Sequence, residues 1–313
     1  MTRILCIGMP VRDLMFRIGG ALAQGSKNPA SHFDEICGGN GLNAAIAIAR
    51  LGGRAALTGP VGDRSEGANR IIFDLLGREG VDTAHLVHMP GLVTATSAIL
   101  IHADGERSNI TFRDPGLWSA RLPDPGMLLD DCSAILTESR CSAFAAELCA
   151  TARARGLPVV IDIDNPMALD DRLLTAASHL IFSSEALRAS AGLSDDVAAL
   201  RKVAGLTPAF LAATRGAQGT IWLDDQQTPR ETPAFPVQAV DSLGAGDVFH
   251  GAFALALTER QDLTGALRFA SAAAALKCTR HGGALGCPQR PEVEAFLTES
   301  SDIGTGQGPG ALP

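Results

Sequence analysis

Short apolar runs alternate with amphipathic segments along most of the chain. Segments 43–51, 66–80 and 143–155 carry apolar residues at helical spacing and end at or beside glycine, which commonly terminates helices. Strands that alternate with helices predict a parallel sheet covered by helices on both faces. The runs predicted to form its strands are 4–8, 55–59, 133–137, 159–164, 179–183, 210–214 and 220–223.

Two stretches, 15–37 and 94–112, break this alternation. In the second, Asp104-Gly105 separates two β-prone runs, which predicts a hairpin. We interpret both stretches as a small β-sheet that stands apart from the α/β body as a lid. The sequence thus predicts one domain over 1–298, with lid segments at about 14–37 and 92–113. A Gly/Pro/Ser-rich tail over 299–313 is expected to be disordered.

Composition narrows the function classes. The 313 residues are 46% hydrophobic and 19% charged, which is ample for a sizeable core. A net charge of -8 argues against nucleic acid or an anionic membrane as partner. The seven cysteines include no C-x-x-C pair and indicate reduced thiols. Because no signal peptide or long apolar segment is evident, a cytoplasmic protein is expected.

The strongest chemical motif is the string Asp241–Gly251. Its Gly244-Ala245-Gly246 predicts a tight turn before an apolar helix. The first-turn amides and the partial positive charge of such a helix form a cradle for phosphate oxygens. Asp247, in that first turn, is placed to accept a proton from a hydroxyl that attacks phosphorus. Asp241 is placed to brace the loop or to hold a cation. The alternative interpretation of the whole string is a glycine turn without a catalytic role, followed by a helix that an Asp caps.

The segment Asp241–Gly251 resembles the C-terminal signature of the PfkB/ribokinase family of carbohydrate kinases, with Ser242 where the family usually has Thr. The resemblance extends from the first strand to about Pro288. It implies a ribokinase-like three-layer α/β/α sheet with a small β-sheet lid, and a homodimer. It also implies ATP, Mg²⁺ and a monovalent cation such as K⁺ as cofactors. By the same resemblance, Asp247 is the catalytic base and the amides of Gly244, Ala245 and Gly246 are the anion hole.

A second glycine motif, Gly38–Asn43, resembles the family's sugar-binding motif, which implies that Gly38, Gly39 and Asn43 contact sugar hydroxyls. Asp13, after the first strand, matches a position that commonly serves the same purpose, because a carboxylate accepts two hydrogen bonds. A rival interpretation is a dinucleotide fingerprint over Gly39–Ala44, and hence an oxidoreductase. Such a fingerprint should directly follow the first strand, whereas this one comes some thirty residues later.

Thr214, Gly216 and Gly219 resemble the family's nucleotide loop; a simple β-turn is the alternative. Many members carry N-x-x-E after a central strand, but Phe182 replaces the Asn here. Glu185 is therefore expected only in the outer shell of the metal. Mg²⁺ itself is expected on charge grounds, because the phosphates of ATP must be neutralised during transfer.

The C-terminal run around Gly246 resembles the sulfofructose kinase branch of the family. That resemblance implies that Lys27 in the lid and Arg140 after a strand clasp an anionic head group, as guanidinium and ammonium groups can. Thr111 stands where the branch often has Asn, which is a departure, and both cations could instead be solvated surface charges.

The sequence therefore predicts an ATP-dependent kinase that phosphorylates a primary hydroxyl of a ketose-type sugar, with an anionic sugar such as sulfofructose as one candidate. A nucleoside or hydroxymethylpyrimidine kinase on the same fold is an alternative. It ranks lower because flat bases call for aromatic stacking and the chain has no Tyr and two Trp. A non-catalytic sugar-binding relative is also possible, but such a protein would not need Asp247.

Overall fold

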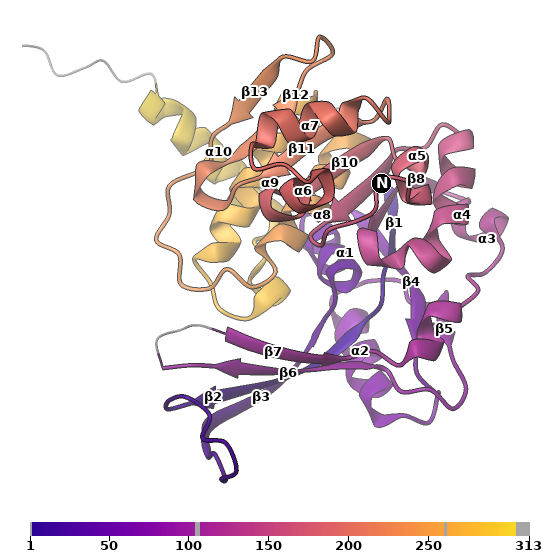
Figure 1. The fold of residues 1–313 in the computed structure, drawn as a ribbon, viewed down its shortest axis with the longest axis vertical. Helices are drawn as coiled ribbons and strands as arrows, with labels where there is room; N and C mark the ends of the chain where they lie inside the picture. Colours follow the sequence, from indigo (N-terminus) through magenta and orange to yellow (C-terminus); the bar gives the residue numbers. More distant parts are fainter. Residues whose placement is uncertain (1, 104–106, 260–261, 305–313) are drawn as a thin grey trace, which may run out of the picture.

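The computed structural model describes residues 2–103, 107–259 and 262–304, and its centre is a nine-stranded sheet (Figure 1). The strand order is β13-β12-β11-β10-β9-β8-β1-β4-β5. The strands are β1 (Arg3–Ile7), β4 (Arg54–Val61), β5 (Leu86–His88), β8 (Cys132–Glu138), β9 (Val159–Ile163), β10 (His179–Ser183), β11 (Phe210–Thr214), β12 (Thr220–Leu223) and β13 (Pro229–Thr232).

The sheet is parallel from β5 to β11, but β12 and β13 pair antiparallel at its edge. The prediction of a uniformly parallel sheet is therefore wrong at this edge. Only the short 3₁₀ turn η3 (Gly216–Gln218) separates β11 from β12. A crossover between parallel strands needs a dozen or more residues. The short link between β11 and β12 can therefore form only an antiparallel hairpin.

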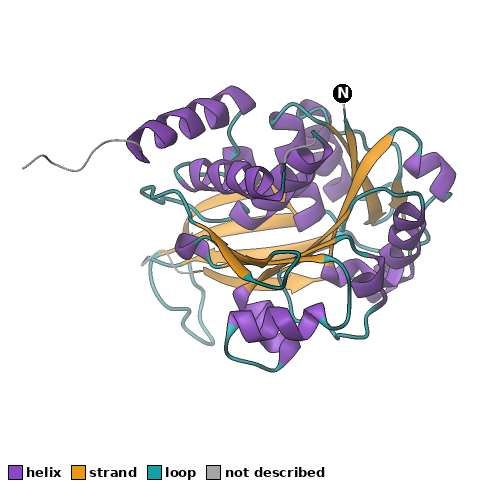
Figure 2. Ribbon diagram, turned by 90° about the horizontal axis from the view of Figure 1, so that it is seen from above, coloured by secondary structure: helices purple, strands orange, loops and turns teal. Residues whose placement is uncertain are grey.

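Helices cover both faces of this sheet, as Figure 2 shows. The two faces are built by side-chain alternation: in β1, Ile4 and Cys6 join one hydrophobic core while Leu5 and Ile7 join the other. This confirms the predicted three-layer α/β/α fold. The helices are α1 (Asn40–Arg50), α2 (Gly67–Arg78), α3 (Pro125–Leu129), α4 (Ser142–Ala154), α5 (Arg172–Ala176), α6 (Ser184–Ala191), α7 (Asp196–Ala204), α8 (Ala245–Thr258), α9 (Leu263–Cys278) and α10 (Arg290–Gly304), with 3₁₀ turns η1 (Pro115–Ser119), η2 (Ser139–Cys141) and η4 (Gly283–Gly286).

A second, four-stranded sheet in the order β3-β2-β6-β7 projects from the body (Figure 1). Its strands are β2 (Val11–Ile18), β3 (Ala30–Gly38), β6 (Ala95–Ile101) and β7 (Arg107–Phe112). The predicted small sheet is thus confirmed; its action as a lid stays a prediction. The expected turn at Asp104-Gly105 lies outside the described residues.

The C-terminal boundary differs from the expectation. Helix α10 continues to Gly304, past the domain end expected at residue 298. Phe296 on this helix packs against Phe235 at 5.1 Å between ring centroids, and the Arg290–Glu294 ion pair supports its first turns. The rest of the expected tail, 305–313, lies outside the described residues. Over the described ranges, no helix has the length and apolarity to cross a membrane, and all seven cysteines are free.

Candidate active site

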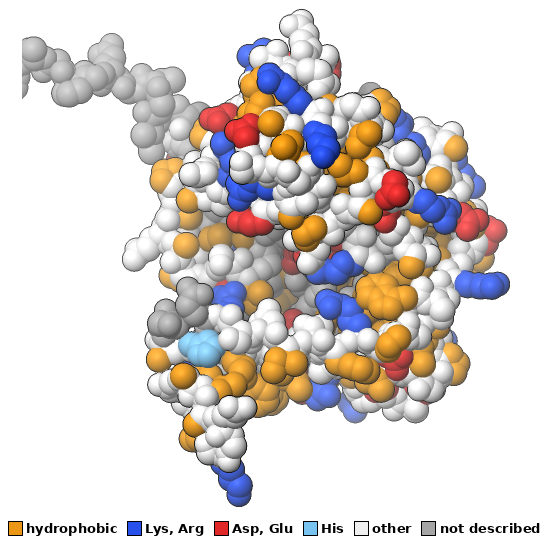
Figure 3. All heavy atoms as spheres, viewed as in Figure 1, with side chains coloured by type: hydrophobic (Ala, Val, Ile, Leu, Met, Phe, Trp, Pro, Cys, Tyr) orange, Lys and Arg blue, Asp and Glu red, His pale blue; other side chains and the backbone are white. Residues whose placement is uncertain are grey.

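The carboxyl ends of β1, β8, β9, β10 and β11 meet at one edge of the main sheet, where open parallel sheets usually bind ligands. A hollow lies between this edge and the second sheet, and Lys and Arg side chains gather along it (Figure 3). Its lining includes Gly39, Asn40, Arg113, Trp118, Glu138 and Arg140.

Helix α8 begins at this hollow, and the predicted turn and helix are confirmed. Gly244 is the N-cap residue with φ 76°, and a Cβ there would lie 3.2 Å from the amide nitrogen of Ala284. The amides of Gly244 and Gly246 have no hydrogen-bond acceptor within the described part of the chain, whereas the Ala245 amide donates to the Ser242 carbonyl at 3.2 Å. Gly244 and Gly246 therefore supply the free donors, and the Ala245 amide is already engaged.

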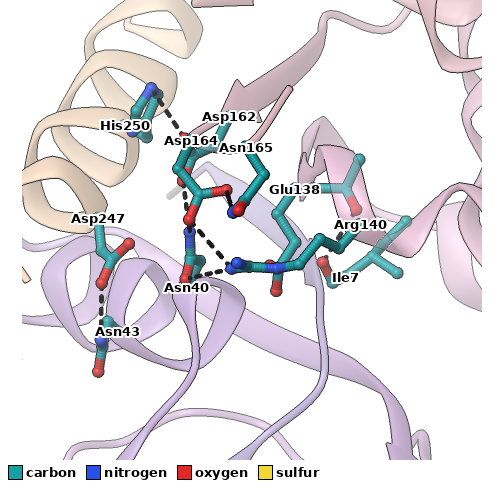
Figure 4. Close-up of polar contacts among 11 residues, drawn as sticks. Ile7, Asn40, Asn43, Glu138, Arg140, Asp162, Asp164, Asn165, Asp247 and His250 are labelled. Carbon is teal, nitrogen blue, oxygen red and sulfur yellow. Dashed lines mark hydrogen bonds and ion pairs between the residues drawn. The ribbon is translucent and has the colours of Figure 1, made fainter. Parts of the chain in front are cut away.

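Asp247 lies in the first turn of α8, and Asn43 of α1 holds its carboxylate. The Nδ2 of Asn43 donates to Oδ2 of Asp247 at 2.6 Å (Figure 4). Although the residue is partly exposed, the protein around its carboxyl group raises the pKa of Asp247 to about 7. Desolvation is the main cause, the negative charge of Asp162 adds to it, and the hydrogen bond from Asn43 opposes it. Asp247 can thus exchange a proton near neutral pH.

The N-terminal glycine motif lies against Asp13. A Cβ on Gly38 would lie 2.1 Å from Oδ2 of Asp13, so only glycine leaves room for this carboxylate. Gly39 has φ 101°, and a Cβ there would lie 2.4 Å from the carbonyl oxygen of Met9. Burial raises the pKa of Asp13 to about 6, against the hydrogen bond from Ser97. The structure therefore places Asp13, Gly38 and Gly39 together, as the sugar-binding interpretation requires.

A polar network at the ends of β8 and β9 was not foreseen, apart from Arg140. Arg140 donates to Glu138 through Nε and Nη2 at 2.9 and 2.7 Å, and Nη2 also lies 3.1 Å from Asp164. Asn40 donates to both Asp162 and Asp164 at 3.0 Å (Figure 4). The positive charge of Arg140 is therefore balanced by nearby carboxylates. The available signal was the position of these acids at strand ends, where parallel sheets place functional groups.

His250, one turn after Asp247 on α8, is buried and belongs partly to this network. Its Nδ1 is 2.7 Å from the Gly246 carbonyl oxygen, and its Nε2 is 3.5 Å from Oδ1 of Asp162. Burial lowers the pKa of His250, so its neutral form is favoured. The imidazole therefore bonds within the first turn of α8, and its Nε2 has no hydrogen-bond partner in the described part of the chain.

Lys27 and Arg140 are not brought together within this chain. Lys27 is exposed on the loop between β2 and β3, and Figure 1 shows that loop at the outer end of the second sheet. Arg140 lines the hollow near the other end of that sheet, where the sheet joins the main body. The expected pair of cations therefore does not form a single site here.

The expected nucleotide and metal residues follow β10 and β11. Thr214 ends β11 and donates to the Phe182 carbonyl at 3.3 Å, and Gly216 is exposed in η3. Gly219 has φ 83°, and its Cβ would lie 2.2 Å from the Thr232 carbonyl oxygen, so strand packing alone requires glycine. Glu185 is exposed in the first turn of α6. The described residues hold no group of three His, Cys, Asp or Glu side chains suited to a metal.

Asp241 braces the loop that leads into α8, one of the two roles expected for it. Its Oδ1 accepts from the Leu243 amide at 2.9 Å and from Arg107 at 2.6 Å. Burial acts to raise the pKa of Asp241, but these donors and the ammonium of Lys277 outweigh it and lower the pKa to about 2. Arg107 and Lys277 were not assigned from the sequence; Lys277 is one of three lysines in the chain.

Comparison with known proteins shows what this chain is similar to. Residues 1–290 match the family model described as pfkB family carbohydrate kinase. The chain is 28% identical to the ribokinase of Bacillus subtilis over 301 residues, covering 95% of this chain and all of that one. It is 28% identical to Fructokinase-1 of Zea mays, covering 87% and 91%. A crystal structure of a ribokinase-like protein from Agrobacterium tumefaciens superposes with a TM-score of 0.88 at 34% identity, covering 96% and 99%.

Proposed function

Since the chain belongs to the pfkB family of carbohydrate kinases, we propose that it transfers the γ-phosphoryl group of ATP to a primary hydroxyl of a ketose-type sugar, with Asp247 as the base. That it is an ATP-dependent carbohydrate kinase follows from its ribokinase and fructokinase relatives. The proposal concerns the identity of the acceptor sugar, the hydroxyl that is phosphorylated and the roles of the individual residues.

The observation that carries the proposal is the position of Asp247 beside the free amides of Gly244 and Gly246, held by Asn43. As the sugar oxygen bonds to the γ-phosphorus, its proton passes to the Asp247 carboxylate. The bond from the γ-phosphorus to the bridging oxygen breaks, and ADP leaves with that electron pair. The two amides and the start of α8 stabilise the negative charge on the transferring oxygens.

The acceptor would lie between Asp247 and the Asp13–Gly38–Gly39 cluster. Asp13 can accept hydrogen bonds from two hydroxyls in one plane, and the absence of side chains at both glycines lets the sugar approach the backbone. Asn43 already donates to Asp247, so we assign it to positioning the base as well as to the sugar-contacting role that the sequence predicts. A small sugar bound there would direct one hydroxymethyl group at Asp247.

An anionic acceptor such as sulfofructose would place its head group in the hollow beside Arg113 and Arg140. The hydrogen bonds of Arg140 use Nε and Nη2, which leaves Nη1 without a partner in the described residues. Arg113 lines the same hollow and forms no ion pair or hydrogen bond within the described ranges. Lys27 could join them only if the β2–β3 loop of a second subunit reached the hollow.

ATP would lie along the carboxyl ends of β10 and β11, with Thr214, Gly216 and Gly219 beside it and its γ-phosphate at α8. Mg²⁺ would be held mainly by the phosphates and water, with the exposed carboxylate of Glu185 in its outer shell, because the described residues hold no group of three side chains suited to a metal. The metal neutralises phosphate charge when bound.

The test is ATP consumption with a panel of fructose, sulfofructose, fructose phosphate and ribose, with product analysis to locate the new phosphate. Phosphorylation of a primary hydroxyl of one ketose supports the proposal. The ratio of kcat/KM between anionic and neutral acceptors shows whether the hollow favours an anionic head group. A change of nicotinamide absorbance without ATP consumption, or turnover only with nucleosides, would refute it.

A further inference from the structure

Lys277 is a fully buried lysine near the active-site loop. It lies in the last turn of α9 with no exposed surface. Its Nζ donates to the main-chain oxygen of Asp241 at 2.6 Å and lies 3.4 Å from Oδ2 of the same residue. Burying an ammonium costs several kcal/mol unless nearby groups compensate it. A charge retained under these conditions has a specific partner, and here that partner is Asp241.

The surroundings of Asp241 resemble a cation site in which the positive charges come from the protein. Carboxylate and main-chain carbonyl oxygens are the ligands that K⁺ takes in proteins, and Asp241 offers both types to Lys277. Its carboxylate also accepts from Arg107 at 2.6 Å and from the amides of Leu243, Gly282 and Gly283 at 2.9, 3.2 and 3.4 Å. With two cations already against this residue, the K⁺ expected from the sequence does not fit there.

The same contacts connect Lys277 to the anion hole. The amides of Val240 and Asp241 both donate to the carbonyl of Cys278, at 2.8 and 3.1 Å, so the end of α9 and the loop form one unit. Asp241 then holds the amide of Leu243, the residue directly before Gly244. A positive charge beside Asp241 therefore fixes the backbone from which the phosphate-facing amides project.

We propose that the ammonium of Lys277 takes the place of a monovalent cation behind the anion hole, so that this kinase needs no K⁺. The link to catalysis rests on the proposed function, because it assumes that the amides of Gly244 and Gly246 meet the transferring phosphate. Lys277 is a positioning residue: it acts through Asp241 and touches no reacting atom.

The experiment measures kcat of the full-length protein in potassium, ammonium and tetramethylammonium salts at matched ionic strength. The wild type should show the same kcat in all three, within about twofold. Lys277→Ala should lose at least about tenfold in tetramethylammonium and regain part of it in K⁺ or NH₄⁺, which can enter the vacated space. Lys277→Met, which fills that space without charge, should stay low in every salt. Lys202→Met is the control, since Lys202 bonds the Ala191 carbonyl at 2.7 Å, away from the site.

Wild-type activation by K⁺ of about tenfold or more, or a Lys277→Ala variant with wild-type kcat in every salt, would overturn the proposal. A second measurement does not depend on turnover or on the variants folding. The thermal midpoint of the wild type should be equal in K⁺ and tetramethylammonium; a specific rise in K⁺ also overturns the proposal. If no sugar is phosphorylated while the midpoint is independent of K⁺, the proposed function fails and the assignment of Lys277 stands.

Discussion

Asn43 and Asp247 are 204 residues apart in the sequence, and a 2.6 Å hydrogen bond from Nδ2 to Oδ2 joins them. One residue belongs to the N-terminal glycine motif and the other to the C-terminal one. The bond therefore connects the element assigned to the sugar with the element assigned to phosphoryl transfer. It also sets the orientation of the carboxylate that we propose as the base.

Replacing Asp247 by Ala should reduce kcat by roughly 10²–10⁴-fold, because the general base is lost while the free amides of Gly244 and Gly246 remain. Steady-state kinetics with the preferred sugar checks this, and calorimetry should show nearly unchanged binding of ATP and sugar. Turnover at the wild-type rate would remove Asp247 from the mechanism.

The pH dependence of kcat should follow the pKa of Asp247, which is raised to about 7. Only the carboxylate can accept a proton, so kcat should rise with pH and be half-maximal near that value. Asn43→Ala removes a donor to the carboxylate, which raises the pKa further and moves the acidic limb to higher pH. Asn165→Ala is the matched control, because the Asn165 amide bonds Asp164 at 2.8 Å and not Asp247. An identical limb in wild type and Asn43→Ala would contradict this assignment.

Asp247 should also cost stability at alkaline pH. Its pKa in the folded protein lies above the ordinary 3.8, so the fold favours the protonated form, and stability falls as pH rises from about 4 through 7. Asp247→Asn should therefore stabilise the protein more at pH 8 than at pH 5. The difference has an upper limit of about 3 kcal/mol, which water at the exposed edge of the residue reduces. Chemical denaturation at the two pH values measures the difference; an equal effect at both would speak against a raised pKa.

Arg140→Ala should destabilise the fold by about 3–5 kcal/mol, since it leaves the buried carboxylate of Glu138, 5% exposed, without its cation. The double variant Arg140→Ala/Glu138→Gln should recover part of this loss. Lys27→Ala, on an exposed loop, should leave stability unchanged. If the hollow takes an anionic head group, Arg140→Ala should raise KM for the anionic sugar more than for the neutral one. Equal changes in KM would exclude Arg140 from that role.

Gly38→Ala should raise KM for the sugar by about 10–100-fold, because the new methyl group would displace the Asp13 carboxylate that now lies 2.1 Å from the Cβ position. KM for ATP should change little. Gly77→Ala on α2 is the control, since its Cβ would have no neighbour within 4 Å. An unchanged KM for the sugar would show that Asp13 does not contribute to substrate binding.

Much of the fold follows from local sequence pattern. Strands β10, β11 and β12 have the predicted bounds, because short β-prone runs with sharp turn or helix signals at both ends leave little freedom. The antiparallel edge was missed because the apolar pattern of a strand does not record its direction. The end of α10 was missed because composition suggested disorder where packing of Phe296 on Phe235 supports a helix.

The sequence by itself determined the glycine turn, the helix after it and the place of Asp247 in its first turn, because backbone conformation there depends on neighbouring residues. Only the tertiary structure decided that Asn43 holds Asp247, that Glu138 and Asp164 balance Arg140, and that Lys277 is buried against Asp241. These are contacts between residues far apart in the chain, and charge balance and pKa depend on distances that no local pattern contains.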